Sequence, residues 1–198
     1  YLSMEDQRVR ALVTSLPLAV EGQPLAKVKM KGLPKEIKGY WSLWQVSFVA
    51  EDIRKVRVLP LFLQEQDGRL LMPTARRIWD MMLQENPAIE IQGYITGRES
   101  EEIFDKLQKH AVQYGHDLFL ELKNLYEAHL EQEREKGEYA FQVRRQAIMR
   151  IGLRAVRQHR LANLEDEKQQ WAQRLKEKQK VLPELSAIVI AYIEGEDS

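Results

Sequence analysis

The proline-free segment from residue 98 to residue 182 constrains the fold more than any other feature of the chain. Pro87 and Pro183 flank it. Within it, apolar or mixed residues recur at steps of three and four, which line one side of an α-helix. The first series is Ile103, Leu107, Ala111, Tyr114, Leu118, Leu122, Leu125 and His129, and the second is Leu161, Leu164, Lys168, Trp171, Leu175, Lys178 and Leu182. Most other residues are good helix formers. The pattern predicts a long helix, a turn and a returning helix.

The two predicted helices differ in length. With a turn near Ile151-Gly152-Leu153, residues 99 to 151 would span about 80 Å, and the return over 155 to 181 only about 40 Å. We therefore expect residues 103 to 125 to pack against a sheet. The rest would pair with the returning helix as an antiparallel coiled coil. If Gly137 breaks the first helix instead, the end of the hairpin becomes a three-helix bundle.

Three segments before the hairpin have the residue patterns of strands. Residues 25 to 31 alternate between lysine-rich and apolar positions, which is typical of a half-buried strand. Residues 41 to 50 are dense in aromatic and β-branched side chains and favour a strand covered on two faces. Residues 55 to 64 contain Pro60, which cannot donate to a ladder and predicts an edge or a bulge.

Two shorter helices and one connector complete this part of the chain. Residues 4 to 16 and 74 to 84 have helical patterns, and Pro73 suits the first turn of the second helix. The buried side of that helix is predicted to contain Ile78, Trp79, Met82 and Leu83. Residues 86 to 97 contain isoleucines interrupted by Gly93, and we interpret them as an extended connector.

The end of the chain carries the apolar run SAIVIAYI, between Pro183 and Gly195. Such a run is typical of a strand buried on both faces, which needs a central place in the sheet. We therefore predict an α+β fold: a mainly antiparallel sheet with packed helices and a long, protruding antiparallel helical hairpin. Residues 1–97 and 183–198 would form the core, and the hairpin, 98–182, would be inserted before the last strand.

Composition excludes some classes of protein. The 198 residues contain 30 basic and 30 acidic side chains and no cysteine, so neither a disulfide framework nor a thiolate metal site is available. The lack of cysteine fits a reducing compartment, and we expect a cytoplasmic protein. No apolar run approaches the roughly 20 residues that span a bilayer, and no membrane partner is expected. Because the chain opens at Tyr1, we interpret it as a piece of a longer protein.

No motif of a catalytic or cofactor site is present. The sequence lacks a glycine-rich phosphate loop followed by lysine, a G-x-G-x-x-G and an H-E-x-x-H. The four histidines are scattered along the predicted helices, and the four tryptophans are more simply core residues than a stacking platform. We therefore predict no catalytic, cofactor-binding or metal-binding residue in this chain and no small-molecule substrate. The isolated chain should not hydrolyse ATP.

One charge feature stands out near the predicted turn. Between Tyr139 and Leu164 there is no acidic residue, whereas residues 127 to 138 contain five glutamates. The basic side chains of the segment could bind a phosphate backbone or an acidic protein surface. They could also solvate a helix surface or pair with the acidic residues 165 to 167. The candidate contacts are Arg144, Arg145, Arg150, Arg154, Arg157 and Arg160.

Several segments together resemble a known family. They are EDQRVRALV at residues 5 to 13, the strand pair WSLWQVSFVAED and RKVRVLPLFLQEQDGRLL, the arm rich in Glu and Arg, and the closing LSAIVIAYIEG. In this order they are similar to the C-terminal region of RapA-type bacterial ATPases, the helicase-like translocases of the Swi/Snf class. The likeness covers nearly the whole chain in architecture and includes no catalytic signature.

The resemblance implies an accessory role. Members of that family join an ATP-driven motor on double-stranded nucleic acid to C-terminal regions, and RapA itself attaches to RNA polymerase. We therefore expect a non-catalytic accessory or regulatory domain, with the helicase core upstream and double-stranded DNA or RNA polymerase as a partner. The alternative, which needs no motor, is a stand-alone coiled-coil interaction protein that dimerises through the helical arm.

Overall fold

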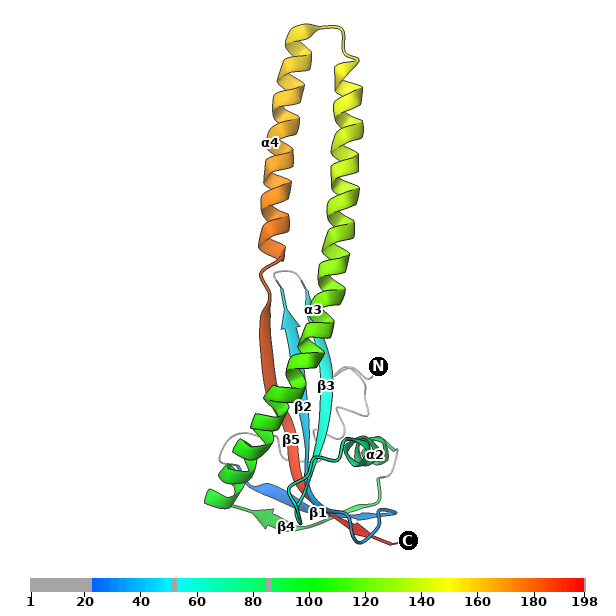
Figure 1. Cartoon of the computed structure of the whole chain (residues 1–198), viewed down its shortest axis with the longest axis vertical. Coiled ribbons are helices and arrows are strands. Elements are labelled where there is room, and N and C mark those ends of the chain that lie inside the picture. Colours follow the sequence, from blue (N-terminus) through cyan, green and yellow to red (C-terminus); the bar gives the residue numbers. More distant parts are fainter. Residues whose placement is uncertain (1–22, 51–52, 85–86, 198) are drawn as a thin grey trace. The chain divides into compact units, whose positions relative to one another are not determined.

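The computed structural model describes residues 23–50, 53–84 and 87–197. The helix predicted at residues 4 to 16 lies outside them. The elements are β1 (Leu25–Lys31), β2 (Lys38–Val49), β3 (Arg54–Gln64), α2 (Met72–Met82), β4 (Ile89–Ile95), α3 (Arg98–Met149), α4 (Arg154–Lys178) and β5 (Leu182–Glu196) (Figure 1). The predicted α+β class, with a mainly antiparallel sheet and a long helical hairpin, is confirmed.

The described chain divides into two compact units. Residues 23–47, 56–119 and 183–197 form the sheet unit, and residues 48–50, 53–55 and 120–182 form the hairpin unit. The division falls within α3, after Phe119. The predicted 98–182 segment is thus shared between the two units, and the first part of α3 belongs with the sheet.

The five strands are arranged in the order β3-β2-β5-β1-β4, with β5 in the centre. β1 runs parallel to β5, with Ala26 opposite Ala191, and antiparallel to β4. The start of β2 meets the ends of both its neighbours, because Gly195 N donates to Ile37 O at 2.9 Å and Glu65 N to Lys38 O at 3.0 Å. β2 is therefore antiparallel to β3 and to β5. The central place predicted for the closing apolar run is confirmed.

The interpretation of residues 86 to 97 as a connector was wrong, because residues 89–95 form the edge strand β4. Lys27 lies opposite Gly93 and Val28 opposite Ile91, so Gln92 is an extra residue in the ladder. Gly93 has a φ of 154°, a conformation that glycine adopts without steric cost. The glycine therefore marks a β-bulge within the strand and does not end it. At the other edge, β3 carries Pro60, as predicted.

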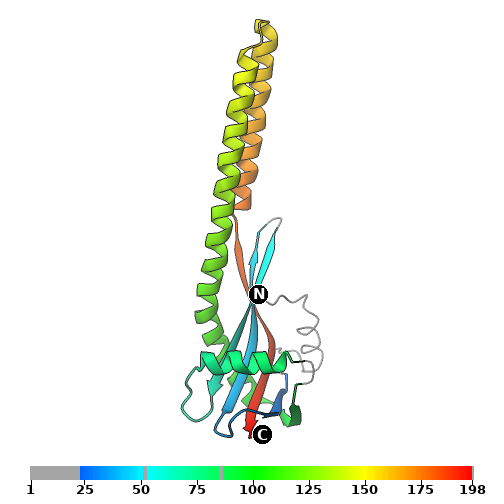
Figure 2. The same cartoon turned by 90° about the vertical axis from the view of Figure 1, so that its right-hand side faces the viewer.

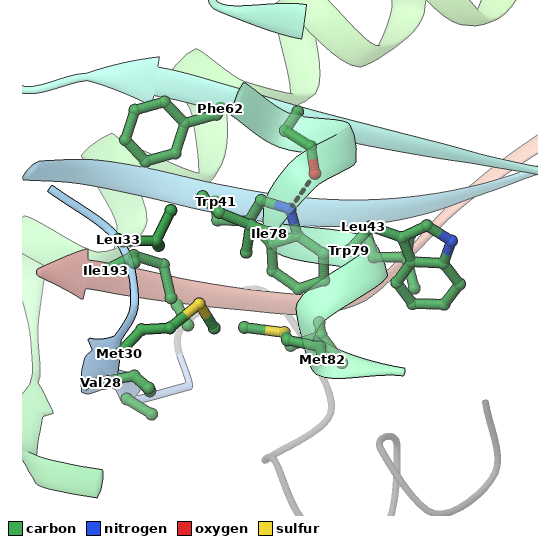
Figure 3. Close-up of a cluster of buried hydrophobic side chains, with 14 of the residues drawn as sticks. Val28, Met30, Leu33, Trp41, Leu43, Phe62, Ile78, Trp79, Met82 and Ile193 are labelled. Atoms are coloured by element: carbon green, nitrogen blue, oxygen red, sulfur yellow. Dashed lines mark hydrogen bonds between the residues drawn. The ribbon is translucent and has the colours of Figure 1, made fainter. Parts of the chain in front are cut away.

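Helices cover both faces of the sheet. On one face, Trp41 and Leu43 of β2 pack in a cluster with Ile78, Trp79 and Met82 of α2 (Figure 3). Trp41 Nε1 donates to the Ala75 carbonyl at 3.1 Å, which satisfies the buried indole. Figure 2 shows α2 lying across the strands. The predicted buried side of α2 is therefore confirmed.

The opposite face of the sheet is covered by the first part of α3. Successive strand residues point to opposite faces, so Trp44 and Val46 lie on the other side of β2 from Trp41. There they cluster with Ile103, Leu107 and Ala111 of α3. Trp41, Trp44 and Trp79 are at most 6% exposed, which confirms their assignment to the core.

Within the hairpin unit, α3 and α4 lie side by side (Figure 2). Glu133 binds Lys178 at 3.2 Å and Arg144 binds Glu167 at 2.6 Å, so the two helices run antiparallel. α3 is continuous through Gly137, and the end of the hairpin is therefore not a three-helix bundle. The turn at residues 150 to 153 lies where it was predicted.

Gly137 lets the two helices approach each other. A Cβ atom at this position would lie 2.2 Å from Cζ2 and 2.7 Å from Cε2 of Trp171 on α4. The ring of Phe141 lies against the same indole, with centroids 5.4 Å apart. Trp171 therefore packs on bare backbone, and this contact offsets the cost of about 1 kcal/mol that glycine carries in a helix interior.

We predict that Ile190→Ala lowers the free energy of unfolding by about 2–5 kcal/mol. Ile190 lies in central strand β5 and is 1% exposed, in the cluster that faces α3. Urea denaturation measures the change. The control is Ile91→Ala on edge strand β4, where the side chain is 43% exposed and the expected loss is below about 1 kcal/mol. Equal losses in the two variants would contradict the central role of β5.

A second prediction concerns Gly137. In an ordinary helix, Gly→Ala stabilises by about 1 kcal/mol. Here Gly137→Ala should destabilise, because the new methyl group collides with Trp171. In a Trp171→Ala background the same substitution should become stabilising. Thermal unfolding of the four proteins of this cycle measures the coupling, and a stabilising effect in both backgrounds would show that the indole does not need the glycine.

Candidate anionic-partner surface at the hairpin turn

The turn between α3 and α4 brings the six candidate arginines to one end of the hairpin unit. Arg144 and Arg145 lie near the end of α3, Arg150 lies in the turn, and the other three follow on α4. All six are within about two helical turns of residues 150 to 153. The arginines that the sequence groups between residues 144 and 160 therefore concentrate positive charge at this end of the hairpin unit.

Two of these arginines support the hairpin itself. Arg144 binds Glu167 at 2.6 Å, with both side chains about half exposed, and its guanidinium lies 5.8 Å from the centre of the Phe141 ring. The hydrogen bond from Arg144 lowers the pKa of the Glu167 carboxyl. Arg157 donates from Nη1 to the carbonyl of Ile151 at 3.0 Å, which ties α4 to the turn. The proposed pairing with residues 165 to 167 is thus correct for Arg144.

The other four arginines have no such role. Arg145, Arg150, Arg154 and Arg160 are exposed, and none of them pairs with a carboxylate among the residues that the structure describes. Arg134, farther along the same helix, bonds both Glu131 and Glu138. An arginine of the hairpin is therefore paired where glutamates lie three or four residues away. At the turn, the sequence has no acidic residue at such a spacing.

Exposed apolar side chains lie among these arginines. Met149 is 56% exposed, Leu153 71% and Val156 39%. Sequence analysis did not single them out, although their spacing on either side of the turn could have been noticed. We call Arg145, Met149, Arg150, Leu153, Arg154 and Val156 together the turn surface.

The start of α4 lacks the residues that usually stabilise the N-terminal end of a helix. Leu153 occupies the N-cap position and makes no side-chain hydrogen bond there, and the first turn contains no acidic residue. Ser, Thr, Asp or Asn is preferred at that position. The first turn instead carries Arg154, although the N-terminal end of a helix is already positive. The sequence here works against local stability.

A second polar cluster lies in the sheet unit. Tyr192 Oη donates to Glu65 Oε2 at 2.7 Å, and the ring of Tyr40 stands edge-on to Tyr192, with centroids 5.4 Å apart. Burial, followed by the bond to Glu65, raises the pKa of the Tyr192 phenol. Burial also raises the pKa of Tyr40. A cavity of about 430 Å³, lined in part by Glu99 and His110, adjoins Tyr40 and Glu65.

In the described parts of the chain, no three His, Asp or Glu side chains converge as metal ligands. None of the helices built from residues 23–50, 53–84 and 87–197 has the length and apolarity needed to cross a bilayer.

Comparison with known proteins gave no relative. The chain matches no family model, no curated protein and no solved structure. The likeness to RapA-type ATPases therefore stays a prediction that depends on the quoted segments alone.

Proposed function

We propose that the chain is a non-catalytic accessory module of a Swi/Snf-class helicase-like ATPase, which contacts an anionic partner through the turn surface. One observation carries the proposal: four exposed arginines at the end of the hairpin lack a carboxylate partner in the described structure. A planar guanidinium donates two parallel hydrogen bonds to a phosphate or a carboxylate. Both kinds of partner are therefore chemically suited to this end of the hairpin.

The energetic argument favours binding over simple solvation. Like charges at helical spacing repel by a few tenths of a kcal/mol for each close pair. Elsewhere on α3 the sequence avoids this cost, as at Arg134 with Glu131 and Glu138. At the turn, unpaired arginines, an uncapped helix start and exposed Leu153 occur together. Positions that break several local rules at once are expected at functional sites.

The link to a motor protein depends on the sequence resemblance. That resemblance implies a helicase core upstream of this chain. The double-stranded DNA held by that core, or an acidic face of a transcription protein such as RNA polymerase, would then be the anionic partner. The catalytic residues would all belong to the upstream core, and the module would couple the motor to its partner.

The alternative function, a stand-alone protein that dimerises through its arm, has one observation in its favour. Leu125 and Tyr139 are 54% and 69% exposed and lie two heptads apart on α3, and Val143, four residues after Tyr139, is 47% exposed. This spacing places the three on one side of the helix. A tight dimer in sedimentation equilibrium would favour this alternative, and a monomer would favour the accessory module.

The proposed function is tested by reversing charge at the turn. The variant Arg145→Glu/Arg150→Glu/Arg154→Glu leaves Arg144 and Arg157, which support the hairpin, unchanged. The matched control, Lys136→Glu/Arg174→Glu/Lys176→Glu, makes the same change of charge at exposed positions of the hairpin unit. Each phosphate or sulfate contact makes binding steeply dependent on salt. We expect the turn variant to elute from heparin at clearly lower salt than the control, with unchanged circular dichroism.

Elution of the two triple variants at the same salt concentration would overturn the proposal. Retention would then reflect total charge, and the turn would be no more than a solvated surface.

A further inference from the structure

We propose that the turn surface binds an amphipathic segment of a protein, in which carboxylates flank large apolar side chains, and that it does not bind nucleic acid. This inference rests on the proposed function, because it names the class of the anionic partner. The observation behind it is that exposed apolar side chains and arginines alternate at the end of the hairpin unit.

The apolar component argues for a protein partner. Leu153 and Met149 expose 71% and 56% of their surface beside Arg154 and Arg150. A phosphate backbone would use the guanidinium groups and leave these apolar atoms without a matching surface. Protein interfaces have the opposite character, because apolar side chains form their centre and Met and Arg are enriched in them. Methionine also adapts its shape to different apolar neighbours.

The spacing of the residues sets what the partner must present. Arg145 and Met149 are four residues apart on α3, and Val156 and Arg160 are four apart on α4, so each pair lies on one side of its helix. Each apolar side chain thus has an arginine next to it, and Leu153 lies between the two helices at the turn. A complementary segment has a few leucine or phenylalanine side chains with Asp or Glu on either side of them.

Charge excludes a self-contact through this surface. Two turn surfaces facing each other would bring together arginines from both copies, with no carboxylate between residues 139 and 164 to compensate them. Like charges placed opposite each other disfavour an interface. The occupant must therefore carry the acidic groups that the turn lacks.

The test uses three synthetic probes with the chain. The first is a helix-forming peptide of Leu and Glu with Leu at helical spacing. The second has the same charge but serine in place of leucine. The third is a duplex DNA of about 20 base pairs, which matches the reach of several phosphate contacts. Fluorescence anisotropy gives the dissociation constants, and anionic phospholipid vesicles are tested by co-sedimentation.

Two protein variants separate the apolar from the charged contribution. The apolar variant is Met149→Gln/Leu153→Ser/Val156→Thr. Its control is Leu125→Gln/Tyr139→Ser/Val143→Thr, which removes apolar side chains of similar exposure from the outer part of α3. We expect the wild type and the control to prefer the Leu-Glu peptide over the serine peptide by about tenfold or more, a ratio typical of losing an apolar interface centre. The apolar variant should lose that preference.

The outcomes keep the two proposals apart. If the apolar variant loses the preference for the Leu-Glu peptide yet elutes from heparin like the wild type, the inference holds. The inference fails if wild type and apolar variant bind that peptide equally, if neither binds it, or if DNA or vesicles bind more tightly. The anionic-partner proposal itself fails only if the charge-reversed variant Arg145→Glu/Arg150→Glu/Arg154→Glu behaves like its own control on heparin.

Discussion

The pairing of β5 with β2 on one side and β1 on the other holds the sheet unit together. Without β5, the β2–β3 pair and the β1–β4 pair would share no backbone hydrogen bond, because β5 separates them in the sheet. Residues 188–191 of β5 are all buried, because helices cover both faces of the sheet at this strand. β5 is also the last element of the chain. The sheet can therefore be completed only after the residues of the hairpin have been synthesised. The contacts of β5 with β1 and β2 are thus long-range in sequence, which is expected to slow folding.

A two-helix hairpin has only one seam in which to bury side chains, and this determines the character of the hairpin unit. Trp171 occupies the seam by packing on Gly137, and Leu164 and Leu175 are the buried residues of α4. Apolar side chains off the seam, such as Leu153, stay exposed. Towards the turn, the seam is supported by Arg144 with Glu167 and by Arg157 with the Ile151 carbonyl. Arg145, Arg150 and Arg154 take no part in this support and stay exposed.

Residue patterning predicted most of the fold. α2 and the first part of α3 each bury one face, as their helical spacing indicated, and β2 buries both faces, as its dense aromatic and β-branched run indicated. Patterning failed at β4, where Gly93 breaks the local pattern although the bulge keeps the ladder intact. The purpose of Gly137 was also unreadable, since it depends on Trp171, which is distant in sequence. The arginine cluster could be predicted from the sequence. That Arg144 and Arg157 support the hairpin, whereas the other arginines do not, could be learned only from the side-chain contacts.

We infer that the turn is selected for contact with a partner at the expense of local stability. Hydrogen exchange of the backbone amides of residues 154 to 164 tests this most directly, in the wild type and in Leu153→Ser/Arg154→Glu. Serine would supply the N-cap that Leu153 lacks, and glutamate would suit the positive helix end, which together are worth about 1–2 kcal/mol. We expect slower exchange in the variant. Unchanged or faster exchange would show that the native residues already stabilise this end of α4 and that the turn carries no cost in local stability.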